Sequence, residues 1–186
     1  MSLRVSFELD ESDLKHFRLI MQNARKAAGR LMPEDIVAAA EELLATISAA
    51  DAPTFIKERL VKLRMMIDML QDIEWRLPHQ EAARVLNALA YFSEPEDLIP
   101  DDIPGLGFLD DAIMIELVVR ELRHEIEAYQ DFCNFRSRER GKSDPKKSVS
   151  RQDWLDNRRK ELQSRMRRRR KQTSLGGRKG GLGLFR

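Results

Sequence analysis

The sequence predicts an all-α protein: a helical bundle of about five helices, followed by a basic C-terminal helix and a flexible tail. Two observations lead to this fold class. Apolar residues recur at intervals of three and four along most of the 186 residues, which is the period of an amphipathic helix. Prolines stand where such stripes begin, at Pro33, Pro53 and Pro78, positions that the first turn of a helix tolerates. The stretch from Val5 to Leu9 is the one candidate for a strand.

The first two expected helices have clear start signals. Asp10 is placed to cap a helix, Asp13 stands three residues on, and Gly29 is expected to end it. The apolar stripe of this helix consists of Leu14, Phe17, Met21, Ala24 and Ala28. A second helix opens at Pro33 with acidic residues in its first turn, where they meet the positive end of the helix dipole. Its expected buried residues are Ile36, Ala40, Leu43 and Ile47.

Three more helices complete the predicted bundle. The third runs from Pro53 to about Leu77, with a stripe of Ile56, Leu60, Leu63, Ile67, Leu70 and Leu77. The fourth is short, from Pro78 to about Phe92, and the fifth is long, from about Leu109 to Arg138. The fifth carries a heptad-like seam of Ile115, Val119, Leu122, Ile126, Tyr129 and Cys133. Such a seam packs on another long helix, and the third helix offers the matching one.

The net charge of +2 conceals a division of the chain. Residues 141–186 hold 16 Lys and Arg against 4 Asp and Glu, whereas residues 1–140 hold 17 against 27. We therefore expect an acidic helical bundle over 1–140, a hydrophilic linker over 141–150, and a basic helix and tail over 151–186. A body at −10 repels polyanions and a segment at +12 attracts them, so the division of charge indicates that a polyanionic partner binds the C-terminal segment.

A sixth helix is expected from about Arg151 to Lys171. Its apolar content is thin, so a fully packed core helix is not expected, and Trp154 is the residue expected to anchor it to the body. The last fifteen residues, Gln172 to Arg186, contain five glycines and no acidic residue, a composition typical of a segment that is disordered in isolation.

The basic segment is expected to bind a polyanion. Arg165 to Lys171 holds six positive charges in seven residues, and the planar guanidinium of arginine makes paired hydrogen bonds to phosphate. The expected contacts are Arg158, Arg159, Arg165, Arg167, Arg168, Arg169, Arg170, Lys171, Arg178 and Lys179. RNA or ribosome-associated nucleic acid is the favoured partner. Two alternatives remain open: the helix folds back on its own acidic body, or it lies on an anionic membrane surface.

Several classes of protein are excluded at this stage. The longest run without a charge is nine residues, Val85 to Ser93, whereas a membrane-spanning helix needs about twenty apolar residues. The N-terminus lacks the apolar region of a signal peptide. The single cysteine, Cys133, forms no internal disulfide, so we expect a cytoplasmic protein whose contact with the inner membrane, if it has one, is peripheral.

One segment resembles a known family. Residues 97–111 read DLIPDDIPGLGFLDD, which resembles the signature D-L-I-P-D-x-I-P-x-x-G-x-x-D-D of the YkvA-like bacterial domain of unknown function. The residues expected to build this motif are Asp97, Pro100, Asp101, Pro104, Gly107, Asp110 and Asp111. The resemblance covers about Leu86 to Arg123, and Glu96 and Asp102 depart from it by being acidic. It implies a small helical domain, in some members a suspected membrane association, and no agreed activity.

The physics of this motif favours a rigid corner. Its prolines fix the backbone, and Asp110 and Asp111 fall in the first turn of a helix, where carboxylates accept unpaired N–H groups. The alternative is a carboxylate site for Mg²⁺ or Ca²⁺. The acidic residues available to it are Glu94, Glu96, Asp97, Asp101, Asp102, Asp110 and Asp111.

No pattern in the chain predicts an active site. Glu121 and His124 have the Glu-x-x-His spacing of di-iron bundles, but His124 lies on the side of its helix away from the seam and is expected to face solvent. His79 is expected to face solvent as well, and Cys133 to serve as a small apolar residue of the seam. The sequence therefore predicts a non-enzymatic adaptor without a cofactor or metal. Its basic segment is expected to bind nucleic acid, and its acidic body a protein partner.

Overall fold

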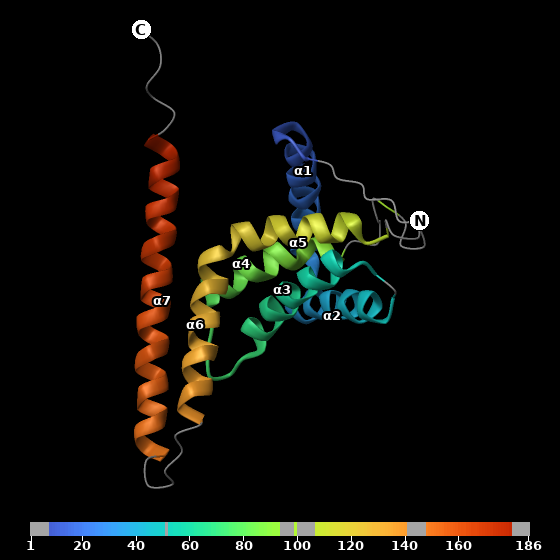
Figure 1. Ribbon diagram of the computed structural model, residues 1–186. Coiled ribbons are helices and arrows are strands. Elements are labelled where there is room, and N and C mark those ends of the chain that lie inside the picture. The colour runs from blue at the N-terminus through green and yellow to red at the C-terminus, as the bar shows by residue number, and fades with distance from the viewer. Residues whose placement is uncertain (1–7, 51, 94–98, 100–106, 141–147, 180–186) are drawn as a thin grey trace.

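The computed structural model describes residues 8–50, 52–93, 99, 107–140 and 148–179, and their arrangement is shown in Figure 1. In α6 and α7, the side chains of 139–140, 148–151 and 175–179 lie outside the description. The prediction of an all-α protein is confirmed, since the described part of the chain forms helices and turns without a strand. Residues 8–10 are not in a strand, and the rest of the predicted strand lies outside the described residues.

The first two helices begin as the sequence predicts. α1 spans Glu11–Ala27, and the Asp10 carboxylate accepts the N–H groups of Ser12 and Asp13 at 2.7 and 3.0 Å. The Asp13 carboxylate accepts the N–H of Asp10 in return, which completes a capping box. A short 3-10 turn, Ala28–Arg30, leads to α2, Pro33–Ala49. Leu44 rather than Leu43 is the fully packed leucine of α2, and Leu43 is half-buried.

α3 spans Thr54–Gln71 and ends six residues before the predicted Leu77. The side chain of Asp72 stops the helix because its carboxylate accepts the N–H groups of Glu74 and Trp75 at 2.9 and 3.0 Å, a local turn that competes with helical bonding. Arg76 has φ 47°, a left-handed conformation that turns the chain further. This turn places the Trp75 side chain fully inside the core. α4 follows at His79–Leu89, with a 3-10 turn at Ala90–Ser93.

The single long helix predicted over 109–138 is two helices. α5 spans Leu109–Glu121 and α6 spans Arg123–Arg140, and the chain bends sharply between them (Figure 1). The break lies at Leu122, whose φ and ψ are −97° and 17° and whose side chain is fully buried. α5 packs on α3, as the predicted seam requires, whereas α6 packs mainly on α7. On α5 the apolar stripe packs on α3, and beyond the break its residue Tyr129 of α6 contacts Asp72 and Trp75 at the end of α3.

α7 spans Ser148–Lys179 and runs antiparallel to α6 at its side (Figure 1). α7 packs by one face, on which Leu155, Leu162 and Met166 are buried, and its opposite face is exposed, so it is not a fully packed core helix, as expected. The expected anchor Trp154 is 61% exposed, so that prediction is wrong. The helix also continues through residues 172–179, which the composition assigned to a disordered tail. Packing against α6 supplies the stabilisation that the isolated segment lacks.

Candidate polyanion-binding helix

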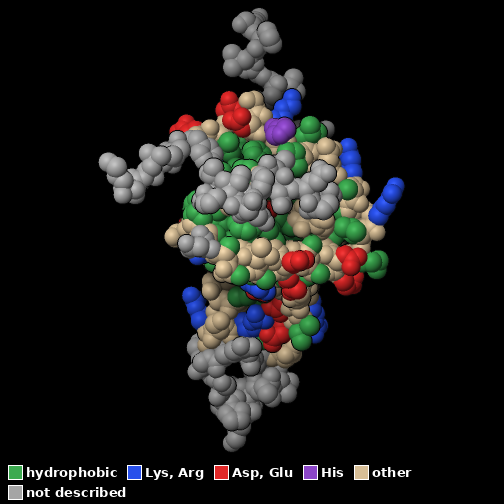
Figure 2. Space-filling view, turned by 90° about the vertical axis from the view of Figure 1, so that its right-hand side faces the viewer, with side chains coloured by type: hydrophobic (Ala, Val, Ile, Leu, Met, Phe, Trp, Pro, Cys, Tyr) green, Lys and Arg blue, Asp and Glu red, His purple; other side chains and the backbone are tan. Residues whose placement is uncertain are grey.

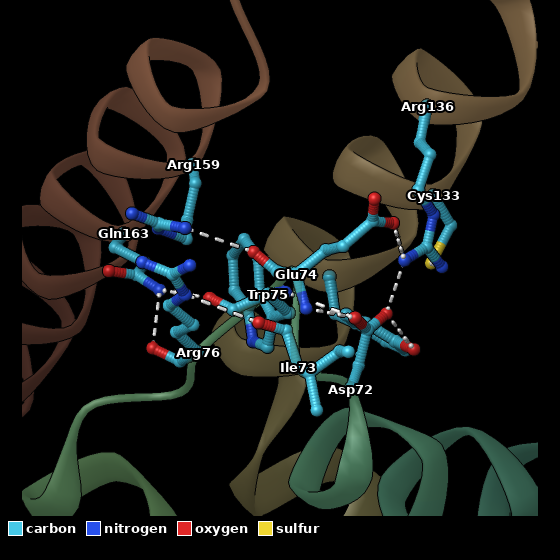
Figure 3. A network of polar contacts seen from close by, with 10 residues as sticks. Asp72, Ile73, Glu74, Trp75, Arg76, Cys133, Arg136, Arg159 and Gln163 are labelled. Atoms are coloured by element: carbon cyan, nitrogen blue, oxygen red, sulfur yellow. Dashed lines mark hydrogen bonds and ion pairs between the residues drawn. The ribbon is translucent and has the colours of Figure 1, made fainter. Parts of the chain in front are cut away.

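The inner side of α7 is held to the rest of the protein by polar side chains as well as apolar ones. Arg159 and Gln163 are buried beside Leu155 and Leu162. Figure 3 shows both reaching the turn that ends α3. Arg159 donates to the carbonyl of Glu74 at 3.1 Å, and Gln163 donates to the carbonyls of Trp75 and Arg76 at 2.9 and 3.3 Å. α7 thus supplies donors to backbone carbonyls that the end of α3 left without helical partners.

The other side of the same turn is fixed by α6. Asp72 accepts from the Tyr129 hydroxyl at 3.0 Å and from Arg136 at 2.7 Å, and Arg136 also donates to Glu74 at 2.9 Å (Figure 3). Burial alone would raise the pKa of Asp72, but these donors and the N–H groups of the turn together lower it. The turn at residues 72–76 is therefore gripped from two sides, by α6 and by α7.

Cys133 lies next to this network. Its side chain is half-buried in the seam of α6, as predicted, and its Sγ is 3.7 Å from Nη2 of Arg136. Burial raises the pKa of the Cys133 thiol, which keeps it protonated at neutral pH. A nucleophilic role has no support in this geometry.

Further along α7, beyond the residues that contact the turn at 72–76, a row of ion pairs joins α7 to α6. Arg165 pairs with Asp131, and Arg169 pairs with Glu127 at 3.2 Å. Arg170 reaches Glu125 at 3.0 Å and Glu81 at 3.5 Å, and both of these carboxylates are almost completely buried. Five of the ten cations predicted to bind a polyanion thus have partners within the chain. Their pairs are Arg158 with Glu161, Arg159 with Asp156, Arg165 with Asp131, Arg169 with Glu127 and Arg170 with Glu125.

The remaining cations lie on the outward face of α7. Arg167, Arg168 and Lys171 make no ion pair with any residue that the structure describes, and Lys160 shares their side of the helix. We call these four residues the outer row. At about 100° of rotation per residue, all four lie within about 100° of one another, on the side away from Leu162 and Met166. Arg178 and Lys179 belong to the same helix, but their side chains are outside the description.

Lys160 is a residue that the sequence analysis missed. It stands seven residues before Arg167 and eleven before Lys171, so helical spacing alone placed it on the same face. Lys160 lies outside the dense run of charge at residues 165–171 that predicted the site. The partners of the inner arginines had no comparable signal, because the acids that bind Arg165 and Arg170 are 34 and 45 residues away.

The signature residues are described only in part. Asp97, Pro100, Asp101 and Pro104 lie outside the described residues, as do most of the carboxylates of the alternative metal site. Gly107 is buried, and Asp110 and Asp111 stand in the first turn of α5, as predicted, with 1% and 6% exposure. Asp110 accepts the N–H of Ile99 at 3.1 Å, so this carboxylate ties the start of α5 to the segment before it. No group of three His, Cys, Asp or Glu side chains positioned for a metal occurs among the described residues.

The two predicted surface histidines differ in outcome. His79 is exposed in the first turn of α4, as predicted. His124 is half-buried, with its Nε2 3.0 Å from the Thr173 hydroxyl, so the prediction of a solvent-facing ring is wrong. The cause is α7, which covers a face of α6 that the seam alone left open.

The face turned away from α7 carries hydrophobic side chains among charged and polar ones. Figure 2 shows hydrophobic side chains around the segments drawn in grey. A groove of about 380 Å³ is lined by residues of α1, α3 and α5, with Leu14, Phe55, Leu109 and Ile113 among its apolar walls and Arg59, Glu116 and Arg120 among its charged ones.

These features define a class of protein: a small all-α domain whose basic C-terminal helix is built into the fold. In the described part of the chain, no helix has the length and apolar character needed to cross a membrane. The model of a family described as a protein of unknown function (DUF1232) matches residues 82–117, which include the signature segment. The uncharacterized membrane protein YkvA of Bacillus subtilis (strain 168) is 32% identical over 80 residues, covering 40% of this chain and 74% of that protein. A comparison with solved structures gives no significant match.

The chain therefore belongs to the YkvA-like family of unknown function, as the signature suggested. The segment matched by the family model covers most of α4, the residues between α4 and α5, and most of α5. α7 lies outside the segment that the family model matches.

Proposed function

We propose that the protein is a non-enzymatic adaptor that binds a polyanion through the outer row of α7. The observation that carries this proposal is the separation of charge on that helix. Its inner arginines are neutralised by acids of the body, whereas Lys160, Arg167, Arg168 and Lys171 are presented outward without a described ion-pair partner. These cations are held on a helix fixed along its length, so binding orders only their side chains.

Nucleic acid, RNA above all, is the first candidate partner. From Lys160 to Lys171 the helix rises about 16 Å, which allows contacts to successive phosphates of one strand or across a groove. Leu155, Leu162 and Met166 are buried against the body, and Trp154 is the one large apolar side chain left exposed on the described part of α7, so this part of the helix presents no apolar stripe to a bilayer. Charge attraction to phosphates without insertion is the interaction that this geometry offers. The acidic body, which repels the same ligand, is proposed to contact a protein partner.

The test compares two variants with equal change of charge. In the first, Lys160, Arg167, Arg168 and Lys171 are all replaced by Gln. In the second, the matched control, Lys15, Lys26, Lys57 and Arg64 are replaced by Gln, four exposed cations of the body. Binding of a labelled RNA hairpin is measured by fluorescence anisotropy at KCl concentrations from about 50 to about 300 mM.

The outer-row variant is expected to lose binding, and the control to keep most of it. Each phosphate contact contributes about 0.7–0.9 to the slope of log affinity against log salt, so four lost contacts flatten the slope by about 3. Equal losses in both variants would show that binding follows net charge and not α7, and the proposal would then be abandoned.

An anionic membrane surface is the second candidate, and a specific observation favours it: the curated relative carries the name of a membrane protein. Each Lys or Arg near such a surface contributes about 1 kcal/mol without insertion. Sedimentation with vesicles of phosphatidylglycerol and phosphatidylcholine, using the same pair of variants, tests this candidate. Vesicle binding lost in the outer-row variant, together with no RNA binding, would identify a protein peripheral to the inner membrane.

A further inference from the structure

A polar hollow lies where the beginning of α6 meets the end of α7. It has a volume of about 310 Å³ and is lined by Arg123, His124, Glu127, Arg169, Gln172 and Thr173. Its walls come from the beginning of α6 and the end of α7, where His124 and Thr173 are 49 residues apart, and it exists only because α7 folds back on α6. None of the residues predicted from sequence to bind a ligand lines it except Arg169.

The lining is rich in hydrogen-bond donors. The two guanidinium groups of Arg123 and Arg169 face one carboxylate, that of Glu127, so the formal charge of the lining is positive. The Thr173 hydroxyl donates to the carbonyl of Arg169 at 3.1 Å, which leaves its oxygen to accept from Nε2 of His124 at 3.0 Å. A cation is repelled by such a lining, and an anion is attracted.

We propose that this hollow binds a single phosphate group of the polyanion that α7 recognises. The inference rests on the proposed function and adds a specific anchor to the less specific outer row. Arg123 is exposed and makes no ion pair with a described residue, so its planar guanidinium is available for two parallel hydrogen bonds to phosphate oxygens. The side-chain amide of Gln172 adds a neutral donor on the opposite wall.

Arg169 supplies the second charge. Its pair with Glu127 spans 3.2 Å, and the two side chains are 51% and 48% exposed. Exposed pairs of this kind are weak, so Arg169 can turn from the carboxylate to a phosphate at small cost. Arg170, one residue on, differs in that its carboxylate partners are buried, and it keeps α7 in place while Arg169 exchanges partners. Neighbouring arginines thus divide the tasks of holding the helix and holding the ligand.

The experiment uses the full chain and inorganic phosphate as the probe. Phosphate is titrated at constant ionic strength against KCl, at fixed pH, while NMR follows the His124 ring and the Thr173 amide. A saturable shift of these signals is expected in the wild-type protein. In Arg123→Gln the apparent affinity is expected to fall at least tenfold, whereas Lys160→Gln, which removes one exposed cation of α7 outside the hollow, retains it. Helical circular dichroism verifies that both variants are folded.

The outer-row variant separates this inference from the proposed function. It is expected to lose RNA binding and still give the saturable shift with inorganic phosphate, because the hollow does not include those four residues. A shift that chloride reproduces, or one that Arg123→Gln leaves unchanged, overturns the phosphate site while leaving the RNA result intact. Phosphate binding in a protein that binds no RNA overturns the link between the hollow and a nucleic acid.

Discussion

The guanidinium of Arg170 lies 3.0 Å from the carboxylate of Glu125, whose side chain is completely buried in α6. Arg84 of α4 approaches the same carboxylate at 3.2 Å, so one buried acid joins three helices. A buried charge is tolerated only where partners compensate its lost hydration. The position of α7 on the body is therefore tied to a buried carboxylate that belongs to the body.

Replacing Arg170 with Met removes the main compensation of Glu125. We expect the free energy of unfolding to fall by about 3 kcal/mol, the lower end of the range for breaking a buried ion pair, since Arg84 remains. Urea denaturation followed by circular dichroism measures this. Arg168→Met is the matched control on the exposed face and should change stability by about 0.5 kcal/mol or less. Similar losses in the two variants would refute the role of the buried pair.

Gln163 offers a test of the grip on the turn. Its replacement by Leu preserves the buried volume approximately but leaves the carbonyls of Trp75 and Arg76 without their donor. The expected cost is about 1–3 kcal/mol, the range for a buried polar group left unpaired. Gln152→Leu, at an exposed position of α7, is the control for the change in side-chain chemistry. An unaltered stability in Gln163→Leu would mean that water replaces the amide without penalty.

Removing α7 is expected to destabilise the body. In a chain that ends at residue 147, the buried faces of α6 and the turn at Trp75 become exposed to water. We expect the emission of Trp75 to shift to longer wavelength and the melting temperature to drop. Full-length Trp154→Phe, which retains Trp75 as its one tryptophan, is the reference for both readings. A truncated protein with reference-like emission and melting temperature would show that α7 is dispensable for the fold.

Stability should respond to acid through Asp72. Its folded pKa lies below the ordinary value of 3.8, so the deprotonated form is favoured by folding. The stabilisation from Asp72 is therefore fully present above pH 3.8 and is lost as the pH falls below that value through the lowered folded pKa. Urea titrations at a series of pH values between 7 and 2, in wild type and Asp72→Asn, measure this. The stability difference between the two should shrink at the acid end, and a constant difference would contradict the assignment.

Local signals in the sequence determined much of the fold. The capping box of Asp10 and Asp13 depends on residues three apart, and its geometry follows from the sequence alone. The end of α3 was misplaced because the apolar stripe continues to Leu77, whereas the Asp72 side chain captures the N–H groups that a longer helix would need. The break at Leu122 left no mark on the stripe, because the residue is apolar and buried on either interpretation.

The sequence predicts that the candidate site lies on a basic helix, but not which of its cations point outward and which pair with the body. Arg165, Arg169 and Arg170 are indistinguishable by composition from Arg167 and Arg168. What separates them is the position of Asp131, Glu127 and Glu125 on a helix that begins more than twenty residues earlier. The hollow at His124 had no sequence signal either, since its walls come together only after α7 has packed on α6.

The two sides of α7 are subject to different constraints. A substitution at Arg159, Gln163 or Arg170 disturbs a turn or a buried acid of the body, so those positions change only together with their partners. The outer row touches none of these groups and is free to mutate one residue at a time. Such a helix can acquire a new ligand without risking the fold that carries it. Proteins descended from a common ancestor with this helix are therefore expected to differ in what they bind sooner than in how they are built.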